Sequence, residues 1–175
     1  MSTMNSKQFS SLQENRIADY LNWSVVKGSG ARPTAPGDII SSEWLGECKT
    51  HEVSGKPIYF NLNVWTKICA EAQSKFRRPA LFTDDGSQSL STTWCMFNVD
   101  LGMPSNVKYV PIKSNRSSIS FEHTRQLQQY AELYAKQPDA IWCYVQKVDV
   151  DSHTMNVGIV PISIFALLFR SMSRC

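Results

Sequence analysis

The sequence has no CxxC pair, no long hydrophobic run and little excess charge of either sign. Its five cysteines, at 48, 69, 95, 143 and 175, are odd in number, which argues against a zinc ribbon and against a disulfide framework. The longest apolar run, 162–169, is too short to span a bilayer, and residues 1–16 lack the apolar stretch of a signal peptide. These absences exclude a membrane-spanning protein and favour a reducing compartment, the cytoplasm.

The composition is typical of a globular protein and does not identify a binding partner. A chain of 175 residues with 42% hydrophobic residues fits one domain, and it is long enough to bury a core. A net charge of +3 permits a nucleic-acid partner without requiring one. Local groups of residues must therefore carry the functional argument.

The hydrophobic pattern predicts an α/β protein. Helical spacing and strand composition predict helices over 6–21, 61–76 and 121–135, strands at 23–27, 38–40, 44–49, 79–82, 92–99 and 107–112, a hairpin of 140–148 and 155–161, and a short apolar segment at 164–170. The middle helix repeats an apolar residue at spacing four from Val64 to Phe76, so we expect that face to be buried. The order predicts a mixed sheet with helices on its faces.

A carboxylate and an ammonium group lie side by side on the predicted strand 44–49. Side chains alternate along a strand, so Leu45, Glu47 and Lys49 share one face, with Glu47 and Lys49 about 7 Å apart along the backbone. Asp38 opens the preceding strand, and a tight hairpin through 41–43 would bring it alongside Glu47. Two such carboxylates repel each other unless a divalent cation lies between them. Hard oxygen ligands favour Mg²⁺, with Mn²⁺ as a substitute.

Glu14 is a candidate third acid. It shares a helical face with Ile17, Ala18 and Leu21, which is an unusual place for a carboxylate on a purely structural helix. A metal site between this helix and the sheet would account for its position.

These groups suit the hydrolysis of a phosphodiester. A bound metal ion polarises a phosphate oxygen and lowers the pKa of a bound water, and Lys49 would stabilise the developing negative charge or orient the water. Lys27, Arg32 and Lys56 cluster around the same segment, where the phosphates of DNA would approach. The residues therefore predict a nuclease that binds DNA.

Asp38 followed by Glu47-Cys48-Lys49 resembles the D-x(n)-E-x-K signature of the PD-(D/E)xK nucleases. The order around it is similar to that of the archaeal-type Holliday junction resolvases and their phage relatives: a helix bearing Glu14, a strand ending VVKGSG, then GDII, WLGECK and an amphipathic helix. The resemblance covers roughly residues 6–99. It implies a restriction-endonuclease-like mixed sheet flanked by helices, with a nuclease core at 1–99. Residues 100–175 lie outside the resemblance, and their pattern predicts a C-terminal α+β extension packed on the same domain.

The resemblance also implies which residues act. Glu14, Asp38, Glu47 and Lys49 would act together, with the three acids on the metal, and Ser29 in the loop before Asp38 would be a further catalytic residue. The activity implied is that of a Mg²⁺-dependent endodeoxyribonuclease selective for branched DNA. The protein would act in the cytoplasm, which would be that of a bacterial host if a phage encodes it. A homodimer is expected, because a junction requires two symmetric cuts. The sequence departs from the signature at Gly37, where proline is usual.

Other interpretations stay open at this point. A restriction- or recombination-type nuclease of the same superfamily would use the same residues on duplex DNA, and a non-catalytic DNA-binding or interaction protein could keep the fold. Glu47 and Lys49 alone could form a surface ion pair of little energetic weight. Glu14 could be a solvated helix acid, and Ser29 an ordinary loop residue.

Overall fold

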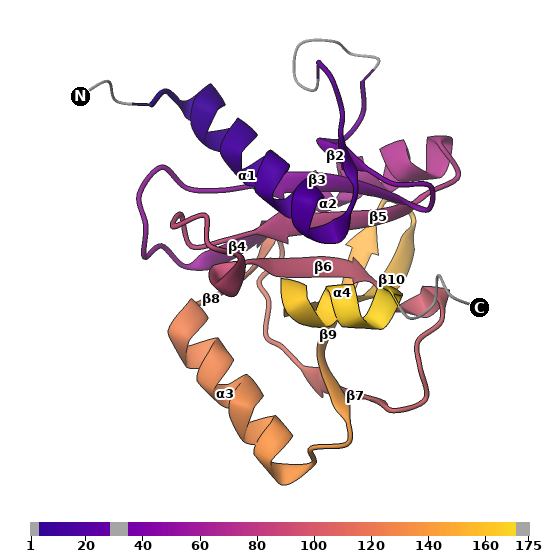
Figure 1. Cartoon of the computed structure of the whole chain (residues 1–175). Coiled ribbons are helices and arrows are strands. Elements are labelled where there is room, and N and C mark those ends of the chain that lie inside the picture. Colours follow the sequence, from indigo (N-terminus) through magenta and orange to yellow (C-terminus); the bar gives the residue numbers. More distant parts are fainter. Residues whose placement is uncertain (1–3, 29–34, 171–175) are drawn as a thin grey trace.

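A large mixed sheet flanked by helices forms the centre of the molecule (Figure 1). The structure, a computed structural model, describes residues 4–28 and 35–170. In chain order the elements are α1 (Ser6–Leu21), β1 (Ser24–Val25), β2 (Ile39–Ile40), β3 (Trp44–Lys49), β4 (Ile58–Asn61), α2 (Leu62–Ser74), β5 (Arg78–Thr83), η1 (Leu90–Thr92), β6 (Trp94–Asn98), η2 (Val99–Leu101), β7 (Val107–Pro111), β8 (Ser118–Phe121), α3 (His123–Lys136), β9 (Ile141–Val150), β10 (His153–Pro161) and α4 (Ile162–Arg170). The expected mixed α/β class is confirmed.

The main sheet has eight strands in the order β1-β2-β3-β5-β6-β10-β9-β7. β3 and β5 run parallel, and α2 lies on the crossover between them, as parallel neighbours require. β7 and β9 are also parallel, whereas the other pairs in this sheet are antiparallel. Because β10 pairs with β6, the second half of the chain continues the sheet that the first half begins.

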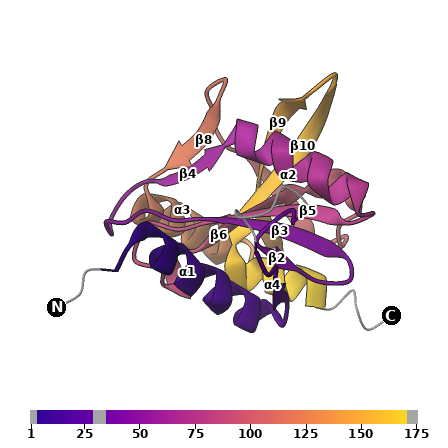
Figure 2. The same ribbon diagram turned by 90° about the horizontal axis from the view of Figure 1, so that it is seen from above.

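Helices cover both faces of the sheet (Figure 2). On one face, Ile17 of α1 and Phe165 of α4 pack in one buried cluster with Phe82 of β5. On the other face, Trp65 of α2 and Tyr130 of α3 belong to a second buried cluster. α4, expected only as a short apolar segment, is thus a packed helix, and no helix in residues 4–28 and 35–170 is long and apolar enough to cross a membrane.

The alternation predicted for β3 is present in the packing. Trp44 and Cys48 are buried with α1 and α4, whereas Leu45 is buried on the opposite face with α2. Gly46 shares the first face, and a Cβ atom there would lie 2.8 Å from Ile39 Cγ1. This close backbone approach explains the glycine, and the alternation puts Glu47 and Lys49 on the face of Leu45.

Two short strands were not expected from the sequence. β4 and β8 pair antiparallel in a separate two-stranded sheet, although about sixty residues of chain separate them. The predicted hairpin of 140–148 and 155–161 is confirmed as β9 and β10, which turn at Asp151 with a φ of 52°. A local turn of this kind is recognisable in a sequence, whereas a distant pairing such as that of β4 with β8 is not.

The expected burial of Phe76 is wrong. α2 ends at Ser74, and the Phe76 side chain is 98% exposed, in a left-handed backbone conformation with a φ of 55°. The backbone N–H of Arg77 donates to the carbonyl of Ala72 at 2.9 Å, which closes the helix and turns the chain toward β5. The helix therefore ends two residues before Phe76, and the turn leaves this side chain in solvent.

Candidate functional site

The β2–β3 hairpin fixes Asp38 beside Glu47. Asp38 donates its backbone N–H to the carbonyl of Gly46 at 2.8 Å, and its Oδ2 accepts the backbone N–H of Cys48 at 2.8 Å. The turn at 41–44 joins the strands directly, as the spacing predicted. The carboxylate of Asp38 is therefore held against the backbone that flanks Glu47.

Gly37 explains the departure from the nuclease signature. Its φ of 69° is one that proline cannot adopt, because the proline ring holds φ near −65°. A Cβ atom at this position would also lie 2.8 Å from Leu45 Cδ1. The glycine at this position is therefore required by the backbone that presents Asp38.

Glu47 and Lys49 form an ion pair, with Lys49 Nζ donating to Glu47 Oε1 at 2.6 Å. Burial alone would lower the pKa of Lys49, but the hydrogen bond to Glu47 and the negative charges of Glu47 and Asp38 outweigh it and raise the pKa above its usual value. Lys49 is consequently a cation at neutral pH, and it lies beside two carboxylates.

One cavity of about 690 Å³ brings together Glu14, Asp38, Glu47 and Lys49. α1 lines it on one side and α2 on the other, where Lys67 pairs with Glu71 at 3.7 Å. The remaining lining residues come from the first turns of α1 and from the segment around β1: Ser6, Lys7, Ser10, Ser11, Val25, Val26, Lys27, Gly28, Ala35 and Gly37. The four residues singled out from the sequence thus share one solvent-accessible space.

The pKa of Glu14 depends on its burial and on the charges of the neighbouring acids. Burial raises its pKa from 4.5 to about 7, and the charges of Asp38 and Glu47 add to the rise, whereas Lys49 opposes it. Such coupling is expected only for carboxyl groups in close proximity. Glu14 is therefore part of an acidic group rather than a solvated helix residue.

The donor set suits a hard cation. Among residues 4–28 and 35–170, no group of three or more His, Cys, Asp and Glu side chains is arranged to hold a metal ion. Mg²⁺ is commonly bound by one or two carboxylates together with water and substrate phosphates. Asp38 and Glu47, on paired strands, are two carboxylates that fit this pattern.

A buried polar group that the sequence analysis missed holds the site together. Gln13 Nε2 donates to the carbonyl of Lys49 at 2.7 Å and to Asp84 Oδ2 at 3.2 Å. Asp84 is fully buried, and its Oδ1 accepts from Thr50 Oγ1 at 2.6 Å and from the N–H of Gly86 at 2.8 Å. Burial raises the pKa of Asp84, and these hydrogen bonds offset part of the rise.

Gln13 could have been found in the sequence. It continues the spacing-four row of Ile17 and Leu21, so it is a polar residue within an apolar stripe, and all three are buried. A buried amide needs hydrogen-bond partners, which here are the end of β3 and Asp84. α1 is thereby tied to the strand that carries Glu47 and Lys49.

The basic residues expected at the site separate into three groups. Lys27 lines the cavity. Lys56 does not, and its backbone N–H donates to the carbonyl of Asp85 at 2.9 Å. Arg32 lies outside the described residues, and so does Ser29, the further catalytic candidate.

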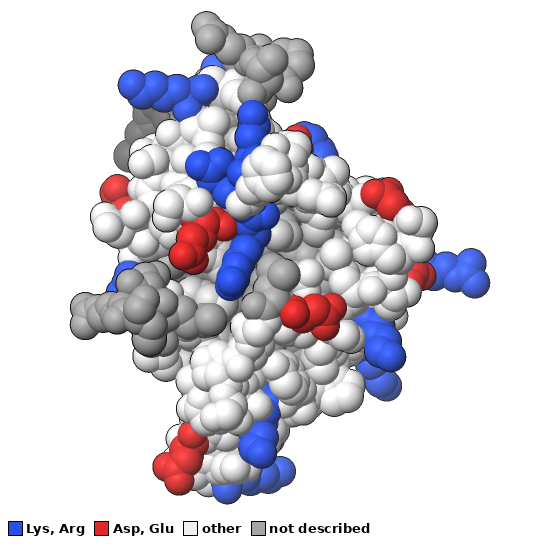
Figure 3. Space-filling model, turned by 90° about the vertical axis from the view of Figure 1, so that its right-hand side faces the viewer, with Lys and Arg blue, Asp and Glu red and all other residues white. Residues whose placement is uncertain are grey.

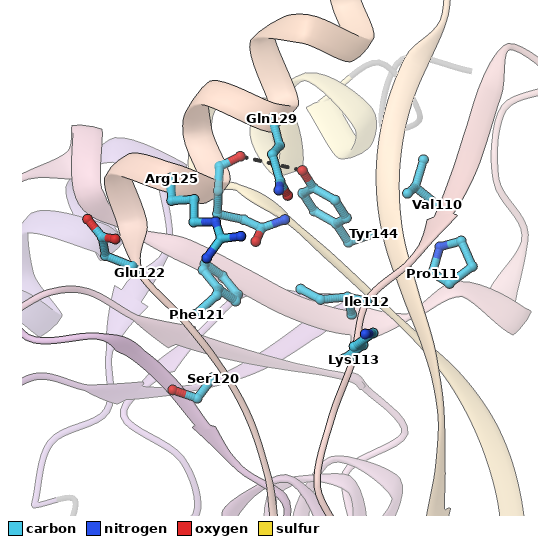
Figure 4. A pocket seen from close by; sticks show the side chains of 11 residues that line it. Val110, Pro111, Ile112, Lys113, Ser120, Phe121, Glu122, Arg125, Gln129 and Tyr144 are labelled. Atoms are coloured by element: carbon cyan, nitrogen blue, oxygen red, sulfur yellow. Dashed lines mark hydrogen bonds between the residues drawn. The ribbon is translucent and has the colours of Figure 1, made fainter.

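A second cavity, of about 480 Å³, lies between β7, β8, β9 and α3 (Figure 4). Lys113, Phe121, Arg125 and Tyr144 line it, and Glu122 is the single acid in its lining. It lacks the paired carboxylates that the predicted chemistry needs, so the first cavity is the candidate site. No family model, no curated protein and no solved structure matches the chain.

Proposed function

We propose that the chain is a metal-dependent DNA endonuclease of the PD-(D/E)xK type with a restriction-endonuclease-like fold. The observation that carries this proposal is the convergence of Glu14, Asp38, Glu47 and Lys49 from three separate segments on one cavity. The order of elements supports it: a helix, three antiparallel strands, the short strand β4 of the separate sheet, a helix, and a strand parallel to the third.

Asp38 and Glu47 would hold Mg²⁺, with Glu14 as a neighbouring acid in the same cavity. When bound, the ion supplies a polarised phosphate oxygen and a water of lowered pKa. Burial raises the pKa of Glu14 to about 7, and repulsion by Asp38 and Glu47 adds to the rise. A divalent cation would relieve the repulsive part, which supports this assignment.

Lys49 contributes a fixed positive charge. Its ammonium group, held by Glu47 at 2.6 Å, stabilises negative charge that develops on a phosphate in the cavity. Its raised pKa favours this electrostatic role over that of a general base, since the group stays protonated at neutral pH. Lys27, which also lines the cavity, adds attraction for the DNA backbone.

Selectivity for branched DNA and a homodimeric state belong to the same proposal. They rest on the resemblance of segments 6–99 to junction resolvases, which cut two strands symmetrically. A duplex-cutting nuclease of the same superfamily is the alternative, and the assay separates the two.

The test compares a four-way junction, a linear duplex and single-stranded DNA, each with Mg²⁺ and with EDTA. We expect Mg²⁺-dependent cleavage of the junction, and a fall of about 100-fold or more in rate for Glu47→Ala and for Lys49→Ala. Lys147→Ala, on the distant strand β9, is the matched control and should cut normally. Cleavage of the duplex alone would favour the duplex-cutting alternative over a junction resolvase. Full activity of Glu47→Ala would contradict the assignment of the catalytic site.

A further inference from the structure

Phe76 is a large apolar side chain that the fold leaves in solvent. It is 98% exposed, and the other exposed large hydrophobic residues of the described chain reach at most 62%. Its φ of 55° is a left-handed conformation that is unfavourable for a bulky side chain. Folding therefore gains no burial from this ring and bears a backbone cost to place it, which points to a role outside stability.

The backbone beneath Phe76 is anchored. Arg77 Nε donates to the carbonyl of Ser41 at 2.8 Å, and the Arg78 guanidinium lies 5.6 Å from the centre of the Trp44 ring. Both contacts tie the segment 75–78 to the β2–β3 hairpin. The ring thus projects from a fixed base rather than from a loose loop.

The anchored segment lies close to the acidic cavity. Glu71, which lines the cavity, is in the last turn of α2, and this helix ends at Ser74, two residues before Phe76. Trp44, under Arg78, is about 10 Å from Glu47 along β3. Successive nucleotides are about 3.4 Å apart along a strand, so a strand bound at the cavity would reach Phe76 within a few nucleotides.

The surroundings of Phe76 are cationic. Lys75, Arg77 and Arg78 flank it in the sequence Lys-Phe-Arg-Arg. α2 ends on the side of the molecule seen in Figure 3, where Lys and Arg side chains form a band over the upper part of the face. An exposed aromatic ring within a positive surface is the combination that binds bases by stacking and phosphates by charge.

We propose that Phe76 stacks on an exposed base of bound DNA, a few nucleotides from the phosphate presented to the cavity. This inference rests on the proposed function and deepens it. Base stacking is interrupted where the arms of an open junction meet, so a fixed aromatic ring would favour branched DNA over a fully stacked duplex without reading its sequence.

A second copy of the chain is the competing occupant of this surface. A two-fold contact centred on Phe76 would bring Arg77 and Arg78 of both copies together, because the same patch meets itself across a two-fold axis. The like charges would repel each other, whereas DNA phosphates would neutralise them. Charge complementarity therefore favours DNA.

The experiment measures binding without cutting, by fluorescence anisotropy of a labelled four-way junction and a duplex in Ca²⁺, which replaces Mg²⁺ poorly in a tight octahedral site. We expect Phe76→Ala to weaken junction binding by about 5- to 100-fold, the range typical of one stacked base, and to change duplex binding little. Phe76→Trp should keep the affinity. Leu127→Ala, at a 40% exposed position on α3, is the matched control and should bind as the wild type does.

Four outcomes would overturn the inference. Equal junction binding by the wild type and Phe76→Ala removes the stacking role and leaves the proposed nuclease intact, whereas failure of the wild type to bind any DNA removes both. A dimer-to-monomer change in Phe76→Ala by light scattering, with unchanged DNA binding, assigns the surface to a second copy. A melting temperature of Phe76→Ala well below that of the wild type assigns the ring to stability.

Discussion

Replacing Glu14 with Gln tests the acidic cavity through stability alone. The folded protein raises the pKa of Glu14 from 4.5 to about 7, so between these values the folded chain binds more protons than the unfolded chain. The free energy of unfolding must then fall as pH rises through that window. A fully buried carboxyl with such a shift would lose about 3 kcal/mol. Glu14 is only half-buried, and solvent screening reduces the expected loss to about 1 kcal/mol.

The assay is urea unfolding of the wild type and Glu14→Gln at pH 4.5, 6 and 8, without divalent cations. Gln cannot ionise, so we expect the variant to match the wild type at pH 4.5 and to be more stable by about 1 kcal/mol at pH 8. Glu132→Gln, at an exposed position of α3, is the control and should show no pH-dependent difference.

Two results would refute this reasoning. A stability difference between Glu14→Gln and the wild type that does not change with pH would mean that Glu14 is an ordinary surface acid. Mg²⁺ should also stabilise the wild type more than the variant, because a cation among the carboxylates favours the ionised form of Glu14. Equal stabilisation of both would remove Glu14 from the metal site.

Two further predictions concern the frame of the site. Gly46→Ala would place a Cβ atom 2.8 Å from Ile39 Cγ1, and we expect a loss of about 1 to 3 kcal/mol in urea unfolding; unchanged stability would contradict the close approach. Gln13→Ala removes the donor to the Lys49 carbonyl and to Asp84, and should cost about 1 to 3 kcal/mol and reduce cleavage, since β3 loses its tie to α1. If Gln13→Ala unfolds and cleaves as the wild type does, the hydrogen bonds of Gln13 do not position β3.

Part of the candidate site follows from short-range rules. Alternation along β3 puts Glu47 and Lys49 on one face, and the short turn at 41–44 brings Asp38 alongside, because both effects act within about ten residues. The helices α1 and α2 were predicted to within two residues at each end, since their apolar repeats are long. The burial of Phe76 was mispredicted, because a repeat does not reveal where a helix must turn back to reach its next strand.

The sequence by itself determined the acid and lysine group on the β2–β3 hairpin and the helical faces that cover the sheet, since period and spacing act locally. Only the tertiary structure decided that Glu14 joins this group. Its place depends on α1 packing over β3, with Gln13 reaching Lys49 and Asp84 across separations of 36 and 71 residues. The pairing of β10 with β6, the β4–β8 sheet and the exposure of Phe76 were decided in the same way. Each depends on which surfaces are left to be buried once the sheet has formed, and no local pattern records that.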